Sequence, residues 1–169
     1  MKAWFGSVLI GAMAVASACA TAQPAPASSA EVAAPKNVYV TRHLQKGEGD
    51  DPSLTAEGSA NAEKLAAMLA DKGITAIFVT PTRRTTETAT PLAKRLGITI
   101  TTYDPRDPDA LVKAVAAAPG PVLVVGHSNT VPDLVARFGG QRPAPMSEED
   151  FGTLFVVEPD GTVAATEVR

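Results

Sequence analysis

The two histidines of this chain stand in similar surroundings. His43 ends the stretch 37–43 (Asn-Val-Tyr-Val-Thr-Arg-His), and His127 follows the apolar run 122–125 and Gly126. Unbroken runs of β-branched and aliphatic residues predict strands that are buried on both faces, as in a parallel sheet. In an open α/β sheet, sites form outside the carboxyl ends of the strands. The sequence therefore predicts that both histidines converge on one pocket.

Arginines accompany these histidines. Arg42 directly precedes His43, and the pair Arg83 and Arg84 follows a second predicted strand at 74–79. Guanidinium groups suit bidentate contact with a phosphoryl group. A histidine held in one tautomer can present its other ring nitrogen as a nucleophile. The cations would then stabilise the charge that develops on the phosphoryl oxygens, so these residues point to phosphoryl chemistry.

Strands and helices must alternate to position these residues. Helices are expected between Thr55 and Gly73, from Thr82 to Gly97, over 109–118 and over 131–138, and further strands are expected at 98–102, 154–157 and 163–168. Residues 147–150 resemble a helix start or a capped turn. The last two strands flank Pro-Asp-Gly, which is a hairpin signal. This order predicts an α/β fold, a three-layer αβα sandwich whose mostly parallel central sheet has an antiparallel edge.

The N-terminal residues predict export rather than folding. Lys2 and a short apolar run indicate a signal peptide over residues 1–18. The stretch ending at Cys19 resembles a bacterial lipobox, in which Cys19 would be lipidated, while ordinary cleavage near the same place is the alternative. Residues 19–35, rich in Ala, Pro and Ser, predict a flexible linker before a domain at 36–169. The expected location is the bacterial periplasm, anchored by lipid to a membrane, or else soluble there or secreted.

Composition narrows the choice of partners. The formal net charge of −3 gives no electrostatic case for binding nucleic acid or an anionic membrane surface. We therefore expect no nucleic-acid partner, and a membrane contact only through a lipid at Cys19. Two distant histidines and one cysteine make no zinc ligand set. A serine esterase is disfavoured, because no histidine follows Ser128 in the chain.

Three motifs in order resemble those of a known family. They are Thr-Arg-His-Leu-Gln-Lys at 41–46, Thr-Pro-Thr-Arg-Arg-Thr-Thr-Glu-Thr-Ala at 80–89 and Val-Gly-His-Ser-Asn-Thr at 125–130. Together they resemble the histidine phosphatase superfamily, in its phosphoglycerate mutase-like branch, over about residues 36–169. The resemblance implies a phosphoglycerate mutase-like fold. It also implies a phosphatase that needs neither metal nor cofactor and acts on a small phosphorylated substrate or a phosphoprotein.

The resemblance also implies roles for individual residues. His43 matches the nucleophile that becomes phosphohistidine, and Arg42, Arg84 and His127 match residues that bind the phosphoryl group. Spacing within the second motif selects Arg84 rather than Arg83, and Ser128 and Asn129 are expected to contact substrate. The general acid stays open. Candidates after the third strand are Asp104 and Asp107, and those in the loop after His43 are Glu48, Asp50 and Asp51.

Two residues depart from the family pattern. Leu44 and Gln45 stand where the family commonly has Gly or Ala and then Glu, which puts pocket shape and rate in question. A rival hypothesis follows, in which the chain is a catalytically weak phosphate-sensing or scaffold lipoprotein on the same fold. Lys46 we expect to be surface charge rather than a contact at the rim of the site.

Overall fold

The computed structural model describes residues 36–168 together with Met1. These residues form six strands and four helices in alternating order until the final hairpin. Their bounds are β1 Val38–Arg42, α1 Ala56–Leu69, β2 Ala76–Val79, α2 Arg83–Leu96, β3 Ile100–Thr102, α3 Pro108–Ala117, β4 Val122–Gly126, α4 Val131–Arg137, β5 Thr153–Val157 and β6 Val163–Glu167.

All six strands belong to one sheet, in the order β3-β2-β4-β1-β5-β6. The first four run parallel, while β5 is antiparallel to both β1 and β6. The α/β prediction, with its mostly parallel sheet and antiparallel edge, is confirmed. In the β1–β4 pair, Arg42 is opposite Gly126. Because each histidine is the next residue along its strand, this register brings His43 and His127 to the same end of the sheet.

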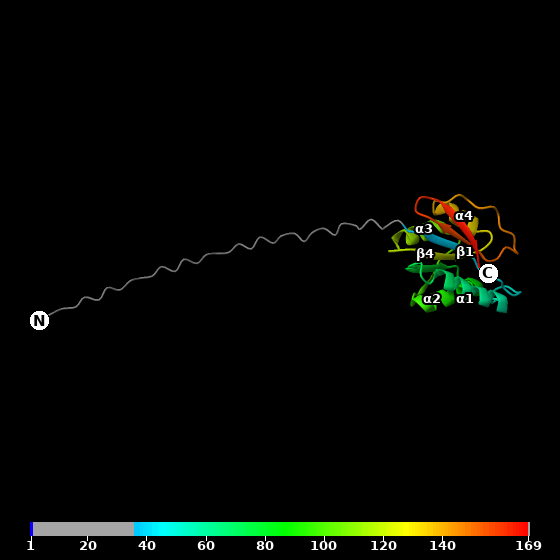
Figure 1. Ribbon diagram of the computed structural model, residues 1–169, viewed down its shortest axis with the longest axis horizontal. Coiled ribbons are helices and arrows are strands. Elements are labelled where there is room, and N and C mark those ends of the chain that lie inside the picture. The colour runs from blue at the N-terminus through cyan, green and yellow to red at the C-terminus, as the bar shows by residue number, and fades with distance from the viewer. Residues whose placement is uncertain (2–35, 169) are drawn as a thin grey trace. The chain divides into compact units, whose positions relative to one another are not determined.

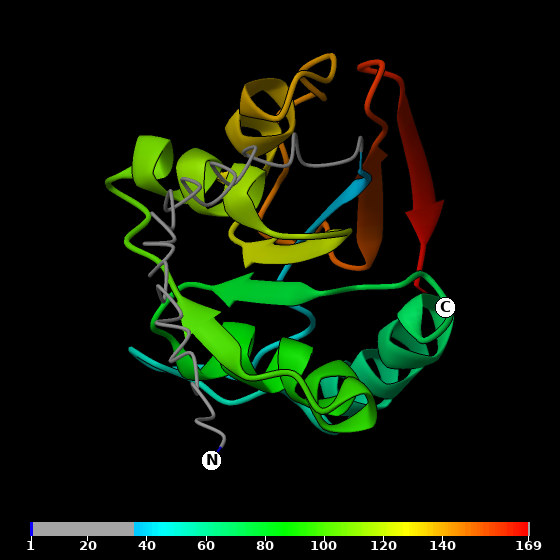
Figure 2. The same cartoon turned by 90° about the vertical axis from the view of Figure 1, so that its left-hand side faces the viewer.

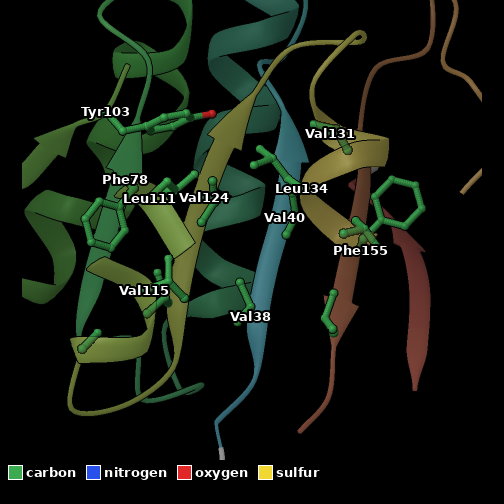
Figure 3. Packing of buried hydrophobic residues seen from close by; sticks show 14 residues of the cluster. Val38, Val40, Phe78, Tyr103, Leu111, Val115, Val124, Val131, Leu134 and Phe155 are labelled. Atoms are coloured by element: carbon green, nitrogen blue, oxygen red, sulfur yellow. The ribbon is translucent and has the colours of Figure 1, made fainter. Parts of the chain in front are cut away.

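Helices cover both faces of the sheet, with α1 and α2 on one side and α3 and α4 on the other (Figures 1 and 2). Alternate residues of each strand supply the two cores. Val40 and Val124 pack with Leu134 of α4 and Leu111 of α3, as Figure 3 shows. Their neighbours Tyr39, Leu123 and Val125 belong to the opposite core, with Leu65 of α1 and Leu92 of α2. The central strands are thus buried on both faces, as their unbroken apolar runs predict.

The end of α1 and the starts of β2 and β3 lie a few residues from the predicted places, whereas α2 and the turn at 147–150 agree with the predictions. Helix α1 ends at Leu69, and a turn carries the chain to Gly73, whose φ of +67° suits glycine. Helix α2 continues through Pro91 to Leu96. Residues 147–150 form a capped turn instead of a helix, in which the Ser147 N–H donates to Asp150 Oδ2 at 2.6 Å.

The predicted signal peptide at 1–18, the lipidation site Cys19 and the linker at 19–35 lie outside the described residues, apart from Met1. Within the part of the chain that the structure describes, no helix is both long and apolar enough to cross a membrane.

Candidate active site

The carboxyl ends of β1 and β4 fix the position of His43. Its backbone N–H donates to the Gly126 carbonyl at 3.0 Å, and the residue is only 2% exposed. At Gly126 an added Cβ would lie 2.8 Å from Thr130 Oγ1, so a side chain there would collide with the following turn. This close packing brings the rings of His43 and His127 to 5.4 Å between centroids, at an interplanar angle of 66°.

One contact selects the tautomer of His43. Its Nδ1 lies 2.9 Å from the Leu44 carbonyl oxygen, which can only accept, so Nδ1 must carry a proton. Burial lowers the pKa of His43 to about 4. The charges of Arg42, His127 and Arg84 also lower this pKa, whereas the hydrogen bond to the Leu44 carbonyl raises it. At neutral pH the ring is therefore uncharged, and Nε2 carries a free lone pair, as a nucleophile requires.

His127 is held through a hydroxyl instead of a carbonyl. Its Nε2 lies 2.8 Å from the hydroxyl of Thr80, which follows β2. Its backbone N–H donates to Thr130 Oγ1 at 2.9 Å. Burial lowers the pKa of His127 to about 4, helped by Arg84 and Arg42 and opposed by Glu148. With Nε2 engaged by Thr80, Nδ1 is the ring nitrogen that remains for a ligand.

The two adjacent arginines at the start of α2 point to different surroundings. The side chain of Arg84 is 17% exposed, lines the same cavity as both histidines and lies 3.5 Å from Asp51. Its Nε–H is buried and has no acceptor among the described residues. Arg83 is 63% exposed and pairs with Glu87 on the helix surface. The structure thus places Arg84, and not Arg83, in the cavity wall.

Arg42 is surrounded by one segment, Ser147–Phe151, which precedes β5. Its guanidinium, 1% exposed, donates to the Ser147 and Asp150 carbonyls at 2.7 and 3.2 Å and to Glu148 Oε2 at 3.0 Å. The ring of Phe151 lies 4.2 Å from the Arg42 Cζ. Only the buried Nε–H lacks an acceptor among the described residues. Arg42 itself does not line the cavity. Glu148, which accepts a hydrogen bond from Arg42, lines it instead.

These residues enclose an open, polar cavity of about 440 Å³. The walls combine two imidazoles with cations and hydrogen-bonding side chains, a set suited to an anion such as a phosphoryl group. Two of them were not predicted to be site residues: Lys46, which we expected to be surface charge only, and Glu148. The lining residues are His43, Lys46, Arg84, His127, Ser128, Asn129 and Glu148.

The carboxylates predicted as candidate acids lie elsewhere. Asp104 accepts from Arg106 at 2.8 Å, which holds the pKa of Asp104 at about 2, and Asp107 caps α3 by accepting from the Ala110 N–H at 3.1 Å. Both line a separate hollow beside α3. Glu48 and Asp50 are exposed in the loop after His43, and neither lines the cavity of the histidines.

Asp51, the remaining candidate acid, sits beside the cavity without lining it. Its Oδ1 lies 3.5 Å from Arg84 Nη1 and accepts from the Arg83 N–H at 3.0 Å. The carboxylate thereby supports the start of α2 and its arginine. Among the described residues, Glu148 is the carboxylate that lines the cavity.

Leu44 and Gln45, which depart from the family pattern, make packing and hydrogen-bond contacts outside the cavity. Leu44 is fully buried, and its N–H donates to Thr88 Oγ1 at 3.0 Å. The Gln45 side chain accepts from Asn61 at 3.2 Å, and its carbonyl accepts from the Thr55 N–H at 2.9 Å. Gly58 packs so tightly here that a Cβ would lie 2.1 Å from the Gln45 oxygen. Neither Leu44 nor Gln45 lines the cavity.

Across residues 36–168, no group of three or more His, Cys, Asp or Glu side chains could hold a metal ion. The positive charge around the cavity comes from side chains, chiefly Arg42, Lys46 and Arg84.

Comparison with known proteins gives a family and a set of structural relatives. Residues 38–107 match the model of the histidine phosphatase superfamily (branch 1). No curated protein sequence matches the chain. The fold is similar to that of SixA from Agrobacterium tumefaciens, with a TM-score of 0.58 and 19% identity over 78% of this chain and 96% of the other.

Two further solved structures hold oxyanions. The protein histidine phosphatase SixA complexed with tungstate is 19% identical, with a TM-score of 0.59 over 77% of this chain and 94% of that one. A mycobacterial glucosyl-3-phosphoglycerate phosphatase in complex with inorganic phosphate is 15% identical, with a TM-score of 0.59 over 78% and 95%. At these identities the similarity establishes a shared fold.

Proposed function

We propose that this chain, whose residues 38–107 match the model of the histidine phosphatase superfamily (branch 1), hydrolyses a phosphomonoester or a phosphoprotein through a phosphohistidine on His43. The observation that carries this proposal is the state of the His43 ring, which is neutral and protonated on Nδ1, with Nε2 free beside a cationic cavity. Structural relatives of the chain include a protein histidine phosphatase and a sugar-phosphate phosphatase. Both substrate classes are therefore candidates here.

The proposed reaction has two steps. In the first, His43 Nε2 attacks phosphorus in line, and the P–N bond forms as the bond to the leaving oxygen breaks and that oxygen takes a proton from a general acid not assigned to a residue. The imidazole becomes positively charged, and the Leu44 carbonyl, which accepts from Nδ1, stabilises that charge. In the second step, water attacks phosphorus and gives up a proton to solvent, and the P–N bond breaks, which releases phosphate and the neutral ring. Arg84 and His127 would bind the phosphoryl oxygens in both steps.

A chromogenic aryl phosphate tests the proposal. The purified protein should hydrolyse it equally well with and without a chelator, and His43→Ala should lower kcat by at least about a thousandfold, because the nucleophile is lost. Substantial turnover by a clean preparation of His43→Ala would disprove the assignment of the nucleophile. A folded wild-type protein that binds phosphate but turns over no substrate would favour the rival sensor or scaffold hypothesis.

Trapping the intermediate separates catalysis from binding. Rapid denaturation at alkaline pH during turnover of a labelled phosphate ester should leave an acid-labile phosphoryl group on His43, since phosphoramidates survive base. His127→Ala serves as the companion variant, because it lowers turnover while leaving the nucleophile in place. A label that persists in His43→Ala would place the intermediate on a different residue.

We also propose that the protein is exported and anchored by a lipid on Cys19, as the N-terminal sequence predicts. Expression in a bacterium with a radiolabelled fatty acid tests this. Label should enter the wild-type protein and be absent from Cys19→Ser, and an unlabelled wild-type protein in the soluble periplasmic fraction would support ordinary cleavage instead.

A further inference from the structure

Glu148 joins two groups that a phosphoryl ligand would need. Its Oε2 accepts from Arg42 Nη2 at 3.0 Å, and its Oε1 accepts from Ser128 Oγ at 2.6 Å. The same side chain lines the cavity beside His43, and it lies 106 residues from Arg42 in the chain. A carboxylate therefore stands where cationic and hydroxyl donors of the site converge.

The charge of Glu148 matches that of the expected ligand. The hydrogen bond from Ser128 and the charge of Arg42 lower the pKa of this carboxyl group, with smaller contributions from Lys46 and His43. Like a phosphoryl group, an ionised carboxylate offers two oxygens that accept charge-assisted hydrogen bonds from a guanidinium. A phosphoryl oxygen that approached Arg42 Nη2 would meet this negative charge.

The other contacts of Arg42 limit which of its N–H groups could reach a ligand. Its Nη1 is occupied by the Ser147 and Asp150 carbonyls, so Nη2 and Nε are the groups through which it could reach a ligand. Glu148 accepts from Nη2, yet its own side chain is 77% exposed. Because the carboxylate reaches solvent while Arg42 stays buried, Glu148 can turn away when another anion takes over its hydrogen bonds.

We propose that Glu148 is an internal anion that competes with the phosphoryl group for Arg42 and Ser128, and so sets the phosphate affinity of this site. The inference rests on the proposed function, because it assumes that the cavity of His43 and His127 binds phosphoryl groups. In the absence of ligand, Glu148 neutralises Arg42. On binding, the phosphoryl group displaces the carboxylate and takes over its hydrogen bonds.

Direct binding of inorganic phosphate and of orthovanadate, measured by calorimetry, tests the inference without relying on turnover. Glu148→Gln keeps the shape of the side chain and removes its charge. It should bind either anion about tenfold more tightly, the size expected for removing one like charge at a partly solvated site. KM for an aryl phosphate should fall by a similar factor. Glu148→Ala, which removes the competing oxygens altogether, should do at least as much.

Glu149→Gln is the matched control. It removes the same charge from the adjacent exposed residue, whose side chain makes no hydrogen bond or ion pair with the described residues. Its phosphate affinity should stay within about twofold of the wild-type value, since charges screened by solvent interact weakly. An equal gain in both variants would mean that net charge, and not the position of Glu148, controls affinity, and would overturn the proposal.

The remaining outcomes separate this inference from the proposed function. Measurable phosphate binding that is unchanged or weaker in Glu148→Gln would overturn the inference and leave the function intact. A large loss of kcat at unchanged phosphate affinity, greatest for substrates with poor leaving groups, would make Glu148 a proton donor instead of a competitor. No phosphate binding by any of these proteins, confirmed as folded by circular dichroism, would overturn both.

Discussion

Two regions build the cavity, and they hold their side chains in different ways. At the carboxyl ends of β1 and β4, His43 is buried and fixed by the Gly126 carbonyl through its backbone and by the Leu44 carbonyl through its ring. In the segment Ser147–Phe151, Glu148 is exposed and held only through the side chains of Arg42 and Ser128. The strand ends are suited to chemistry that needs exact geometry, whereas the exposed side chain of Glu148 has room to turn when a ligand arrives.

The same contrast separates the two arginines of the site. Arg42 comes from a central strand, yet its guanidinium contacts are made with the covering segment. Arg84 comes from the first turn of α2 and lines the cavity itself. We infer that Arg84 is ready to bind a phosphoryl group at once, while Arg42 joins after Glu148 is displaced.

The largest effect that would sharpen this comparison is expected at Arg84. Arg84→Ala should lower kcat/KM for an aryl phosphate by about a hundredfold, or ~2.7 kcal/mol, because a charge-assisted contact to the phosphoryl oxygens is lost. Steady-state kinetics measures this. Arg83→Ala, its exposed neighbour, removes the same charge and should change kcat/KM by less than about twofold. Equal losses in the two variants would mean that Arg84 has no special position.

A second prediction concerns the buried, neutral state of His43. Its pKa of about 4 lies below its ordinary value of 6.5, so the unfolded chain binds a proton more readily than the folded protein. The associated stability is present above pH 6.5, is lost progressively as the pH falls from 6.5 towards 4, and is fully lost below 4. Between pH 7 and pH 5, the wild-type protein should lose ~2 kcal/mol of unfolding free energy more than His43→Asn, which cannot titrate there.

Urea unfolding at the two pH values measures this difference. His127→Asn is a useful companion variant, because His127 also has a pKa lowered to about 4. Between pH 7 and pH 5, the wild-type protein should lose more unfolding free energy than this variant as well. If wild type and His43→Asn responded to pH identically, His43 would not be buried in its neutral form, and the contrast between a fixed strand end and an adaptable segment would fail.

The strand ends could be predicted from sequence because their signals are local. Apolar runs, a glycine and a histidine lie within a few residues of one another, and motif spacing separated Arg84 from Arg83. The parallel sheet then brings the two histidines together by register alone. The sequence did not show that Leu44, which is buried, and Gln45, which is half-buried, both avoid the cavity.

The covering segment could not be predicted, because its contacts join distant parts of the chain. Ser-Glu-Glu-Asp at 147–150 has the composition of any polar turn, and nothing in it indicates a bond to Arg42. Asp104 and Asp107, by contrast, were predicted as candidate acids but do not line the cavity. The family resemblance points to an acid in the loop after β3, but local partners, Arg106 and the start of α3, engage both carboxylates.

The smallest predicted effect tests how the covering segment supports Arg42. The Phe151 ring lies 4.2 Å from the Arg42 Cζ, and its centroid lies 5.8 Å from that of His43. Phe151→Leu keeps an apolar side chain but removes the cation–π contact, which is worth about 0.5–2 kcal/mol. Because Arg42 would be less firmly oriented, kcat/KM should fall about threefold, mostly through KM.

Phe138→Leu controls for the loss of an aromatic ring. Phe138 packs against the core beside α4, and it makes no contact with Arg42, so the substitution should lower the unfolding temperature while leaving KM unchanged. An effect on kcat instead of KM in Phe151→Leu would mean that the ring acts on His43 and the chemical step. In that case the segment Ser147–Phe151 would belong to the fixed part of the site, and the division between the two regions would have to be redrawn at Phe151.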